Sequence, residues 1–183
     1  MREYNKPDHF IEIYQKLFKE FKDKEGRILE LGIQKGGSLE LWEEWMPKFK
    51  VIGVDVIDCK EFDTERIKTL QMDQCDERIL EYGPFDIIID DGGHKMSQQI
   101  NSFKLLYPAL KSGGLYIIED LNTSYWQEFR DQALPTTDFL KDLIDDVNRD
   151  AFEDRLRCKV DKRKFYDIDS ISFYKYLCVI RKS

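Results

Sequence analysis

The sequence predicts an α/β fold: a doubly wound, mostly parallel seven-stranded sheet that ends in an antiparallel hairpin. Short apolar runs rich in β-branched residues alternate with segments whose apolar residues recur at helical spacing. This alternation is typical of a parallel sheet with helices on both faces, where the strands are buried on both sides. Several of these runs end in acidic residues, and parallel strands bring such residues to one edge of the sheet.

Composition indicates one globular domain over residues 1–183, since 42% of the residues are hydrophobic and 36% are charged. No apolar run approaches the roughly 18 residues of a membrane span, and the N-terminus lacks the apolar region of a signal peptide. We therefore expect a cytoplasmic protein with no membrane partner. The net charge of −7 argues against a nucleic-acid partner. Four cysteines without CxxC spacing indicate reduced thiols.

The N-terminal segment, residues 1–26, is predicted to be helical. Aromatic and aliphatic residues recur at three-to-four spacing over Asp8–Lys22, and Asp8 is a plausible N-cap. A helix packed on the sheet is the simplest interpretation. The alternative is that Asn5, Lys6 and His9 also edge a ligand cleft.

The first predicted strand, Arg27–Gly32, leads through a glycine-rich turn into a helix over Leu39–Trp45. This order is the usual opening of a nucleoside-binding fold, because glycines let the backbone approach a ligand closely. The pattern is not G-x-G-x-x-G, and a turn that only closes the strand–helix corner is the alternative. The candidate ligand-binding residues are Glu30, Gly32, Gly36, Gly37 and Ser38.

The next two predicted strands, Val51–Val56 and Ile67–Met72, each place acidic or amide side chains at the same edge. Asp55 follows the glycine turn at the distance typical of an acid that accepts ribose hydroxyls. Asp73 and Gln74 are candidates for contact with an adenine amine. The alternative for Asp55 is a surface aspartate at a strand end, and the alternative for Asp73 and Gln74 is a simple turn. A short helix is predicted over 76–82.

A strand–helix–strand unit forms the centre of the chain. An apolar run, Ile87–Ile89, is followed by Asp90 and Asp91, and a second run, Leu115–Ile118, is followed by Glu119 and Asp120. Between the runs, helical spacing predicts a helix over residues 98–110 that ends before the glycine pair 113–114.

Three of these acids, Asp91, Glu119 and Asp120, are predicted to converge on one site. Carboxylates left alone would repel one another, and a hard divalent cation such as Mg²⁺ resolves the conflict with an all-oxygen ligand set. His94 lies three residues past Asp91 and is a candidate general base. The alternative is that the acids only cap helices that follow the strands.

Residues 123–160 are predicted to form a lid and a helix inserted before the final hairpin. The chain departs from the strand–helix alternation over residues 123–138, which we interpret as a lid or a wall on the substrate side. A polar helix is predicted over 127–133, a loop over 134–138 and a long amphipathic helix over 139–156. The chain then closes with two apolar segments, Asp169–Tyr174 and Leu177–Arg181, which predict a tight antiparallel hairpin.

Together these motifs resemble the class I S-adenosylmethionine-dependent methyltransferases, which have a Rossmann-like fold. Asp-Asp-Gly-Gly-His at 90–94 and Glu-Asp-x-x-Thr-Ser-Tyr-Trp at 119–126 resemble the macrocin and mycinamicin sugar O-methyltransferases, which are related to proteins labelled cephalosporin hydroxylase-like. The chain departs from that pattern at Gly93, where the family has serine, and at Gln98 or Gln99, where it often has a second histidine.

The resemblance implies S-adenosylmethionine and Mg²⁺ as cofactors and a small-molecule acceptor with a sugar hydroxyl. It implies Asp91, Glu119 and Asp120 as metal ligands and His94 as general base, with Asp91 also in the catalytic set. Related enzymes form dimers or larger homo-oligomers. The residues it implies for the methyl donor are Glu30, Gly32, Gly36, Gly37, Ser38, Asp55, Asp73, Gln74 and Asp90.

Three other functions stay open at this point. One is a catechol-type phenol O-methyltransferase, in which Tyr125 and Trp126 would line a flat acceptor pocket. Another is a catalytically silent, cofactor-binding partner subunit. A nicotinamide dehydrogenase is disfavoured by the missing G-x-G-x-x-G and by the paired acids at 90–91.

Overall fold

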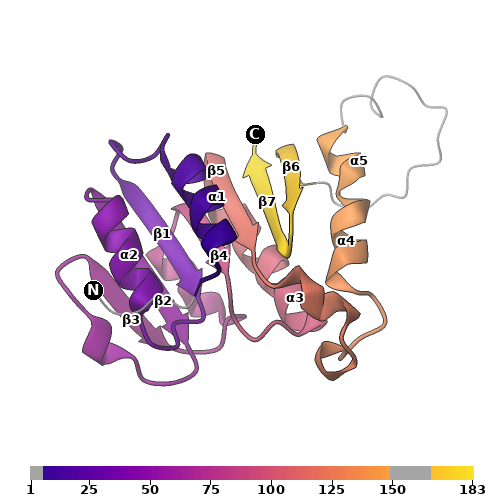
Figure 1. Ribbon diagram of the computed structural model, residues 1–183, viewed down its shortest axis with the longest axis horizontal. Helices are drawn as coiled ribbons and strands as arrows, with labels where there is room; N and C mark the ends of the chain where they lie inside the picture. The colour runs from indigo at the N-terminus through magenta and orange to yellow at the C-terminus, as the bar shows by residue number, and fades with distance from the viewer. Residues whose placement is uncertain (1–5, 149–165) are drawn as a thin grey trace.

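The computed structural model describes residues 6–148 and 166–183. Its centre is a seven-stranded sheet in the order β3-β2-β1-β4-β5-β7-β6, which confirms the predicted fold class (Figure 1). Strands β1 to β5 pair in parallel, whereas β7 pairs antiparallel with both β5 and β6. The strands are Gly26–Leu31 (β1), Phe49–Asp55 (β2), Ile67–Gln71 (β3), Phe85–Asp90 (β4), Leu110–Ile118 (β5), Ile168–Tyr174 (β6) and Leu177–Lys182 (β7).

Helices cover both faces of this sheet (Figure 1). α1 and α2 pack on one face, where the rings of Tyr14 and Trp42 are fully buried with centroids 4.9 Å apart. α3 and α4 pack on the other face around Phe103. Burying a side chain of this size contributes roughly 1.5–3 kcal/mol. The α-helices are Asp8–Phe18 (α1), Gly37–Trp45 (α2), Met96–Leu106 (α3), Thr136–Asp142 (α4) and Ile144–Val147 (α5).

The strand order reverses between β1 and β4, because the chain first builds outward from β1 to β3 and then continues on the other side of β1. Such a reversal opens a crevice at the carboxyl ends of the strands. β1 and β4 are in register there, with Leu31 opposite Asp90. The residues that follow β1, β4 and β5 therefore meet at one edge of the sheet. Within the described ranges, no helix has the length and apolar character needed to cross a membrane.

The ends of several predicted elements differ from the observed ones. α1 ends at Phe18 instead of residue 22, and its N-cap is Pro7, so Asp8 lies in the first turn and is not the cap. α3 ends at Leu106, and a 3-10 turn that contains Pro108 follows it, because proline lacks the N–H that would continue the helix. The glycine pair 113–114 therefore lies inside β5 and does not end a helix.

The region after β5 differs most from the prediction. Only residues 127–129 form a 3-10 turn where a helix over 127–133 is predicted, because this polar segment has few apolar side chains to bury. α4 begins at Thr136, inside the predicted loop, and a break at Leu143 separates it from α5. The rest of the predicted helix, residues 149–156, lies outside the described residues. The C-terminal hairpin is confirmed. The remaining 3-10 helices are Lys60–Phe62, Glu77–Tyr82 and Leu121–Tyr125.

Candidate active site

The glycine-rich turn after β1 has a backbone that only glycine adopts readily. Gly32 has φ +86°, and a Cβ added there would lie 2.1 Å from the carbonyl oxygen of Asp91. Gly36 has φ +74°, and a Cβ there would lie 2.6 Å from the ring of Phe62. The positive φ angles and the short Cβ distances at these two positions are both unfavourable for any residue with a side chain. The turn therefore brings the end of β1 into direct contact with the loop that follows β4.

Glu30 anchors the helix that follows this turn. Its side chain is fully buried, and its Oε2 accepts hydrogen bonds from Ser38 Oγ at 2.8 Å and from Trp42 Nε1 at 3.0 Å. Burial raises the pKa of Glu30, and the ammonium of Lys6 opposes that rise. Glu30 and Ser38, both expected to contact the donor, are thus bonded to each other. Ser38 and Gly37 also line a hollow.

Two hollows meet at this edge, and both are lined by Gly32, Gln34 and Asp91. The Asp55 hollow, about 270 Å³, extends over β2 and β3 and is also lined by Asp55, Asp73 and Gln74. The Asp120 hollow, about 190 Å³, extends over β5 and α1 and is also lined by Lys6, Pro7, Phe10, Ile33, Lys35, Gly37, Ser38, His94, Glu119 and Asp120.

Asp55 is already bonded to the glycine-rich turn. Its Oδ2 accepts hydrogen bonds from the backbone N–H groups of Ile33 at 2.8 Å and Gln34 at 3.2 Å. Its carboxylate still lines the hollow at the end of β2, where the sequence predicts a ribose contact. Asp73 is exposed on the same hollow, and its Oδ1 accepts a bond from Cys75 N at 2.8 Å.

The side chains of Gln74 and Asp90, both expected at the donor site, bond to each other and to neighbouring groups of the protein. Gln74 donates through Nε2 to Asp90 Oδ1 at 3.3 Å and to Ser102 Oγ at 2.9 Å, and its Oε1 accepts from Gly93 N at 2.8 Å. Asp90 is fully buried beneath the hollows, and burial raises its pKa to about 7. These two residues hold the 90–94 loop in place, and Gln74 also lines the Asp55 hollow, so the expected contacts of Gln74 and Asp90 with the donor stay predictions.

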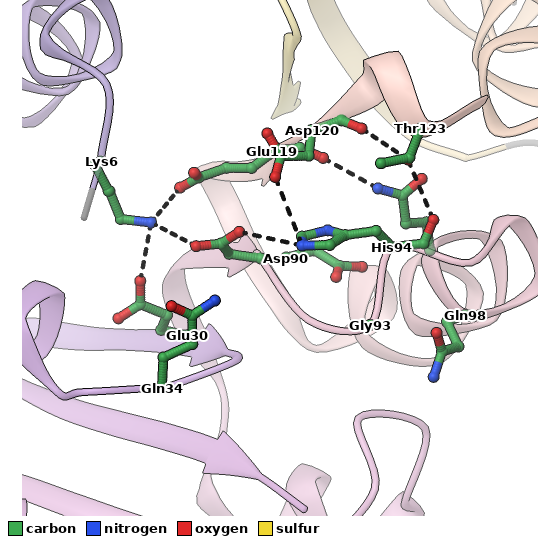
Figure 2. A network of polar contacts seen from close by, with 12 residues as sticks. Lys6, Glu30, Gln34, Asp90, Gly93, His94, Gln98, Glu119, Asp120 and Thr123 are labelled. Carbon is green, nitrogen blue, oxygen red and sulfur yellow. Dashed lines mark hydrogen bonds and ion pairs between the residues drawn. The ribbon is translucent and has the colours of Figure 1, made fainter. Parts of the chain in front are cut away.

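Asp91, His94 and Asp120 converge on the Asp120 hollow. One ligand atom from each lies within 4.8 Å of the others, and His94 Nε2 is 3.8 Å from Asp91 Oδ1 and 3.6 Å from Asp120 Oδ2 (Figure 2). Burial raises the pKa of Asp120, and His94 opposes that rise. This arrangement brings together three of the four residues predicted for metal binding and proton transfer.

His94 and Asp120 both have left-handed backbone conformations, with φ +57° and +54°. Such values are uncommon for residues with a side chain and tend to occur at functional sites. Thr123 holds the two segments together, since its Oγ1 donates to the carbonyl oxygens of His94 at 3.2 Å and Asp120 at 2.8 Å. The side chains therefore point into the same gap because the two backbones are tied to each other.

Glu119, the fourth predicted residue, is held by α1 and by the segment before it. Its Oε1 accepts a hydrogen bond from Lys6 Nζ at 2.6 Å (Figure 2) and another from Tyr14 Oη at 2.5 Å. Among the described residues, its Oε2 accepts no hydrogen bond. Burial raises the pKa of Glu119, whereas the Lys6 ammonium lowers it. Glu119 is therefore a ligand candidate through one oxygen only.

Sequence reasoning did not find all the residues that shape this site. Lys6 lines the Asp120 hollow, as the alternative interpretation of the N-terminal segment holds, whereas His9 is not among the residues that line it, and Asn5 lies outside the described residues. The helical spacing predicts Tyr14 only as an apolar position of the N-terminal helix. Gln99, fully buried, donates to the carbonyl oxygen of Glu119 at 3.0 Å. The available signal is that Gln98 or Gln99 stands where the resembling family often has a second histidine.

The predicted lid segment contributes an aromatic side chain beside His94. The ring of Phe129 lies 6.3 Å from the His94 ring and 6.0 Å from Trp126. Tyr125 and Trp126 are exposed, at 75% and 47% of their surface. Closure of this segment over a substrate stays a prediction.

Comparison with known proteins places this geometry in a family. The family model of FtsJ-like methyltransferases matches residues 10–158, a range that contains the glycine-rich turn and the converging side chains. Mycinamicin VI 2''-O-methyltransferase of Micromonospora griseorubida is 38% identical over 152 residues, which cover 73% of this chain and 38% of that protein. A tetracenomycin-C rhamnosyl 3'-O-methyltransferase of Streptomyces olivaceus is 37% identical over 157 residues, which cover 76% of this chain and 40% of that protein.

Solved structures agree with the sequence comparisons. The MycE methyltransferase from the mycinamycin biosynthetic pathway, in complex with Mg and SAH, superimposes with a TM-score of 0.83 at 32% identity and covers 94% of this chain. Another structure of MycE, with Mg, SAH and mycinamycin VI, has a TM-score of 0.81. The chain spans about two-fifths of the length of the curated relatives and about half of MycE. The predicted resemblance is confirmed, and the chain belongs to the FtsJ-like methyltransferase family.

Proposed function

We propose that this chain transfers a methyl group from S-adenosylmethionine to a hydroxyl of a sugar-bearing small metabolite, with Mg²⁺ bound at the site. The observation that carries the proposal is the convergence of Asp91, His94 and Asp120 beside the glycine-rich turn. Support for the sugar comes from relatives named as sugar O-methyltransferases at 37–38% identity. Because those relatives are more than twice as long, the acceptor belongs to the proposal and not to the family assignment.

The donor would lie in the Asp55 hollow. Gly32 leaves room for close approach of the ligand to the backbone, and Asp55 presents a carboxylate to the ribose hydroxyls. Asp73 is the remaining exposed acid on the adenine side. Both hollows share Gly32 and Asp91, so the reacting end of a donor bound here would reach the Asp120 hollow.

The donor set of the Asp120 hollow fits a hard divalent ion. Asp91 and Asp120 offer carboxylate oxygens, and the Oε2 atom of Glu119 is a third candidate, so oxygen ligands predominate as Mg²⁺ requires. When bound, the ion supplies Lewis-acid polarisation of the acceptor hydroxyl and lowers its pKa. The left-handed conformations at 94 and 120 hold the facing side chains in place before a substrate arrives.

His94 would accept the proton that the acceptor hydroxyl loses. Its Nε2 faces the same gap as the carboxylates of Asp91 and Asp120, at 3.8 Å and 3.6 Å, where the acceptor hydroxyl would lie. The donor would supply the methyl group to the hydroxyl oxygen and would leave as S-adenosylhomocysteine with the electron pair of the carbon–sulfur bond, while His94 Nε2 would hold the proton. Holding the two reactants in this orientation can lower the barrier by roughly 7–11 kcal/mol.

A direct assay tests the proposal. The protein is incubated with S-adenosylmethionine and either mycinamicin VI or catechol, with Mg²⁺ or with EDTA, and methylated product is measured by mass spectrometry. We expect product from the sugar-bearing acceptor only in the presence of Mg²⁺. If only catechol gave product, the acceptor would be a phenol and not a sugar. Donor binding without turnover on either acceptor would favour a silent subunit.

A further inference from the structure

The ammonium of Lys6 lies inside a set of carboxylates that come from three different strand ends. Its Nζ is 2.6 Å from Glu119 Oε1, 2.9 Å from Asp91 Oδ2 and 3.3 Å from Glu30 Oε1 (Figure 2). Its side chain is only 4% exposed. These oxygens surround the nitrogen as ligands surround a metal ion, although Lys6 precedes α1 and belongs to no strand. We call this place the inner position.

Asp91 connects the inner position to a second one. Its Oδ2 faces Lys6, while its Oδ1 faces His94 and lies in the gap shared with Asp120. That gap, bounded by Asp91, His94 and Asp120, is the outer position and is the place proposed above for Mg²⁺. A carboxylate that faces two cation positions through its two oxygens is typical of two-metal sites, in which the ions lie about 3.5–4 Å apart.

Glu30 supplies independent evidence that the inner position is built for a cation. Its side chain is fully buried, and its Oε1 accepts no hydrogen bond within the described part of the chain. That oxygen is directed at the Lys6 ammonium, which lies 3.3 Å away. A buried carboxylate oxygen without a hydrogen bond is strongly unfavourable unless a positive charge compensates it. The cluster therefore needs a cation at this place, and the protein supplies its own.

We propose that Lys6 takes the place of a second divalent ion, so that the site binds a single ion at the outer position. This inference rests on the proposed function, because the outer position is the proposed Mg²⁺ site. Lys6 is then a positioning residue. It neutralises Glu30 and Glu119 and holds one oxygen of Asp91, which leaves the other oxygen for the ion. Replacing its side chain by one that leaves the inner position vacant should open a second metal site.

The test is the number of ions bound, measured by isothermal titration with Mn²⁺ and by electron paramagnetic resonance. We expect one ion for the wild-type chain and two for Lys6→Ala, with a spin-coupled pair in the variant. Lys6→Met is the matched control, because its side chain fills the inner position with apolar atoms and should keep the number at one. Each spectrum reports on the ions directly, without any acceptor or turnover.

The outcomes separate the two hypotheses. No bound ion in the wild-type chain would remove the metal from the proposed function. One ion in both the wild-type chain and Lys6→Ala, or two in the wild-type chain, would overturn the role of Lys6 alone.

A measurement on the wild-type chain covers the case in which Lys6→Ala does not fold. Lysine acylation is compared with and without Mn²⁺, and Lys6 is followed by mass spectrometry. We expect Lys6 to stay protected in both states, since ammonium and ion occupy different positions. Acylation of Lys6 that appears only with Mn²⁺ would mean that the ion displaces it, and would overturn the inference.

Discussion

The Asp55 hollow and the Asp120 hollow adjoin each other at Asp91 but satisfy their polar groups in different ways. Around the Asp55 hollow, the side chains of Asp55 and Gln74 bond to the backbone of neighbouring loops. Around the Asp120 hollow, carboxylates face one another, His94 and Lys6. The first arrangement gives a shaped surface for a neutral part of a ligand. The second concentrates negative charge that favours cations. The contrast predicts that substitutions in one hollow leave ligand binding in the other intact.

Asp91→Asn should have the largest effect, because this carboxylate serves both cation positions. We expect Mg²⁺ affinity and turnover to fall by more than the roughly 10–100-fold typical of residues that only support a metal ligand. Donor affinity should stay close to wild type, since the Asp91 N–H bond to the carbonyl of Leu31 survives. Isothermal titration with Mg²⁺ and, separately, with S-adenosylhomocysteine gives both numbers.

The matched control for Asp91→Asn is Asp138→Asn, an exposed acid paired with Lys141 away from the hollows. This variant should behave as wild type in both titrations. If Asp91→Asn lost donor affinity as strongly as Mg²⁺ affinity, the two hollows would not be independent.

His94→Gln comes next. Loss of a general base typically lowers turnover by roughly 10²–10⁴-fold. We expect Mg²⁺ affinity to change little, because oxygen atoms of Asp91 and Asp120 remain. The control variant is His9→Gln, which replaces the other histidine in the sequence. Its turnover rate should equal that of the wild type. A loss of Mg²⁺ affinity in His94→Gln would instead make the imidazole a metal ligand, and the proton acceptor would have to be sought elsewhere.

The fold and the strand ends can be predicted from the sequence because both depend on local patterns. Apolar runs mark strands, and the next residue is then at the sheet edge, which locates Asp55, Asp91 and Asp120. Partners across the fold leave no such pattern: Lys6 and Glu119 are 113 residues apart, yet 2.6 Å separates their charged atoms. The sequence also does not show in which direction a side chain points at the end of a strand. Asp90 and Asp91 are neighbours, but of these two only Asp91 lines the two hollows.

The C-terminal part of the chain shows a second limit. Residues 127–133 carry helix-compatible residues, but a helix of this length needs an apolar face to bury, and this segment has few apolar side chains that could pack on the core.

The left-handed backbone conformations of His94 and Asp120 also have no sequence signature, because non-glycine residues adopt them only where tertiary contacts such as those of Thr123 hold them.

Asp90→Asn tests whether the buried acid beneath the hollows is structural. Burial raises its folded-state pKa to about 7, above the ordinary value of 3.8. The protonated folded form is therefore favoured, so the contribution of Asp90 to stability is complete below pH 4 and is lost as pH rises toward 7. This loss amounts to at most roughly 4 kcal/mol.

The measurement is urea unfolding of both proteins in EDTA at pH 5, 6, 7 and 8. Asparagine stays neutral and can still accept from Gln74, so the variant should gain in stability relative to wild type as pH rises. Most of that gain should occur between pH 5 and 7. Parallel stability curves for the two proteins would mean that Asp90 does not titrate in this range.

Asp55→Asn should have the smallest effect and is the converse of Asp91→Asn. Asparagine keeps an oxygen that can accept from Ile33 N, so the glycine-rich turn stays in place, but the charge that favours ribose hydroxyls is lost. A hydrogen bond to a charged group contributes roughly 1.5–3 kcal/mol, so S-adenosylhomocysteine should bind about 10–100-fold more weakly. Mg²⁺ affinity should be unchanged. Asp58→Asn, an exposed acid three residues further on, is the control and should bind donor product normally. Equal donor affinity in Asp55→Asn and Asp58→Asn would remove Asp55 from the donor site and leave Asp73 as the acid that faces the ligand.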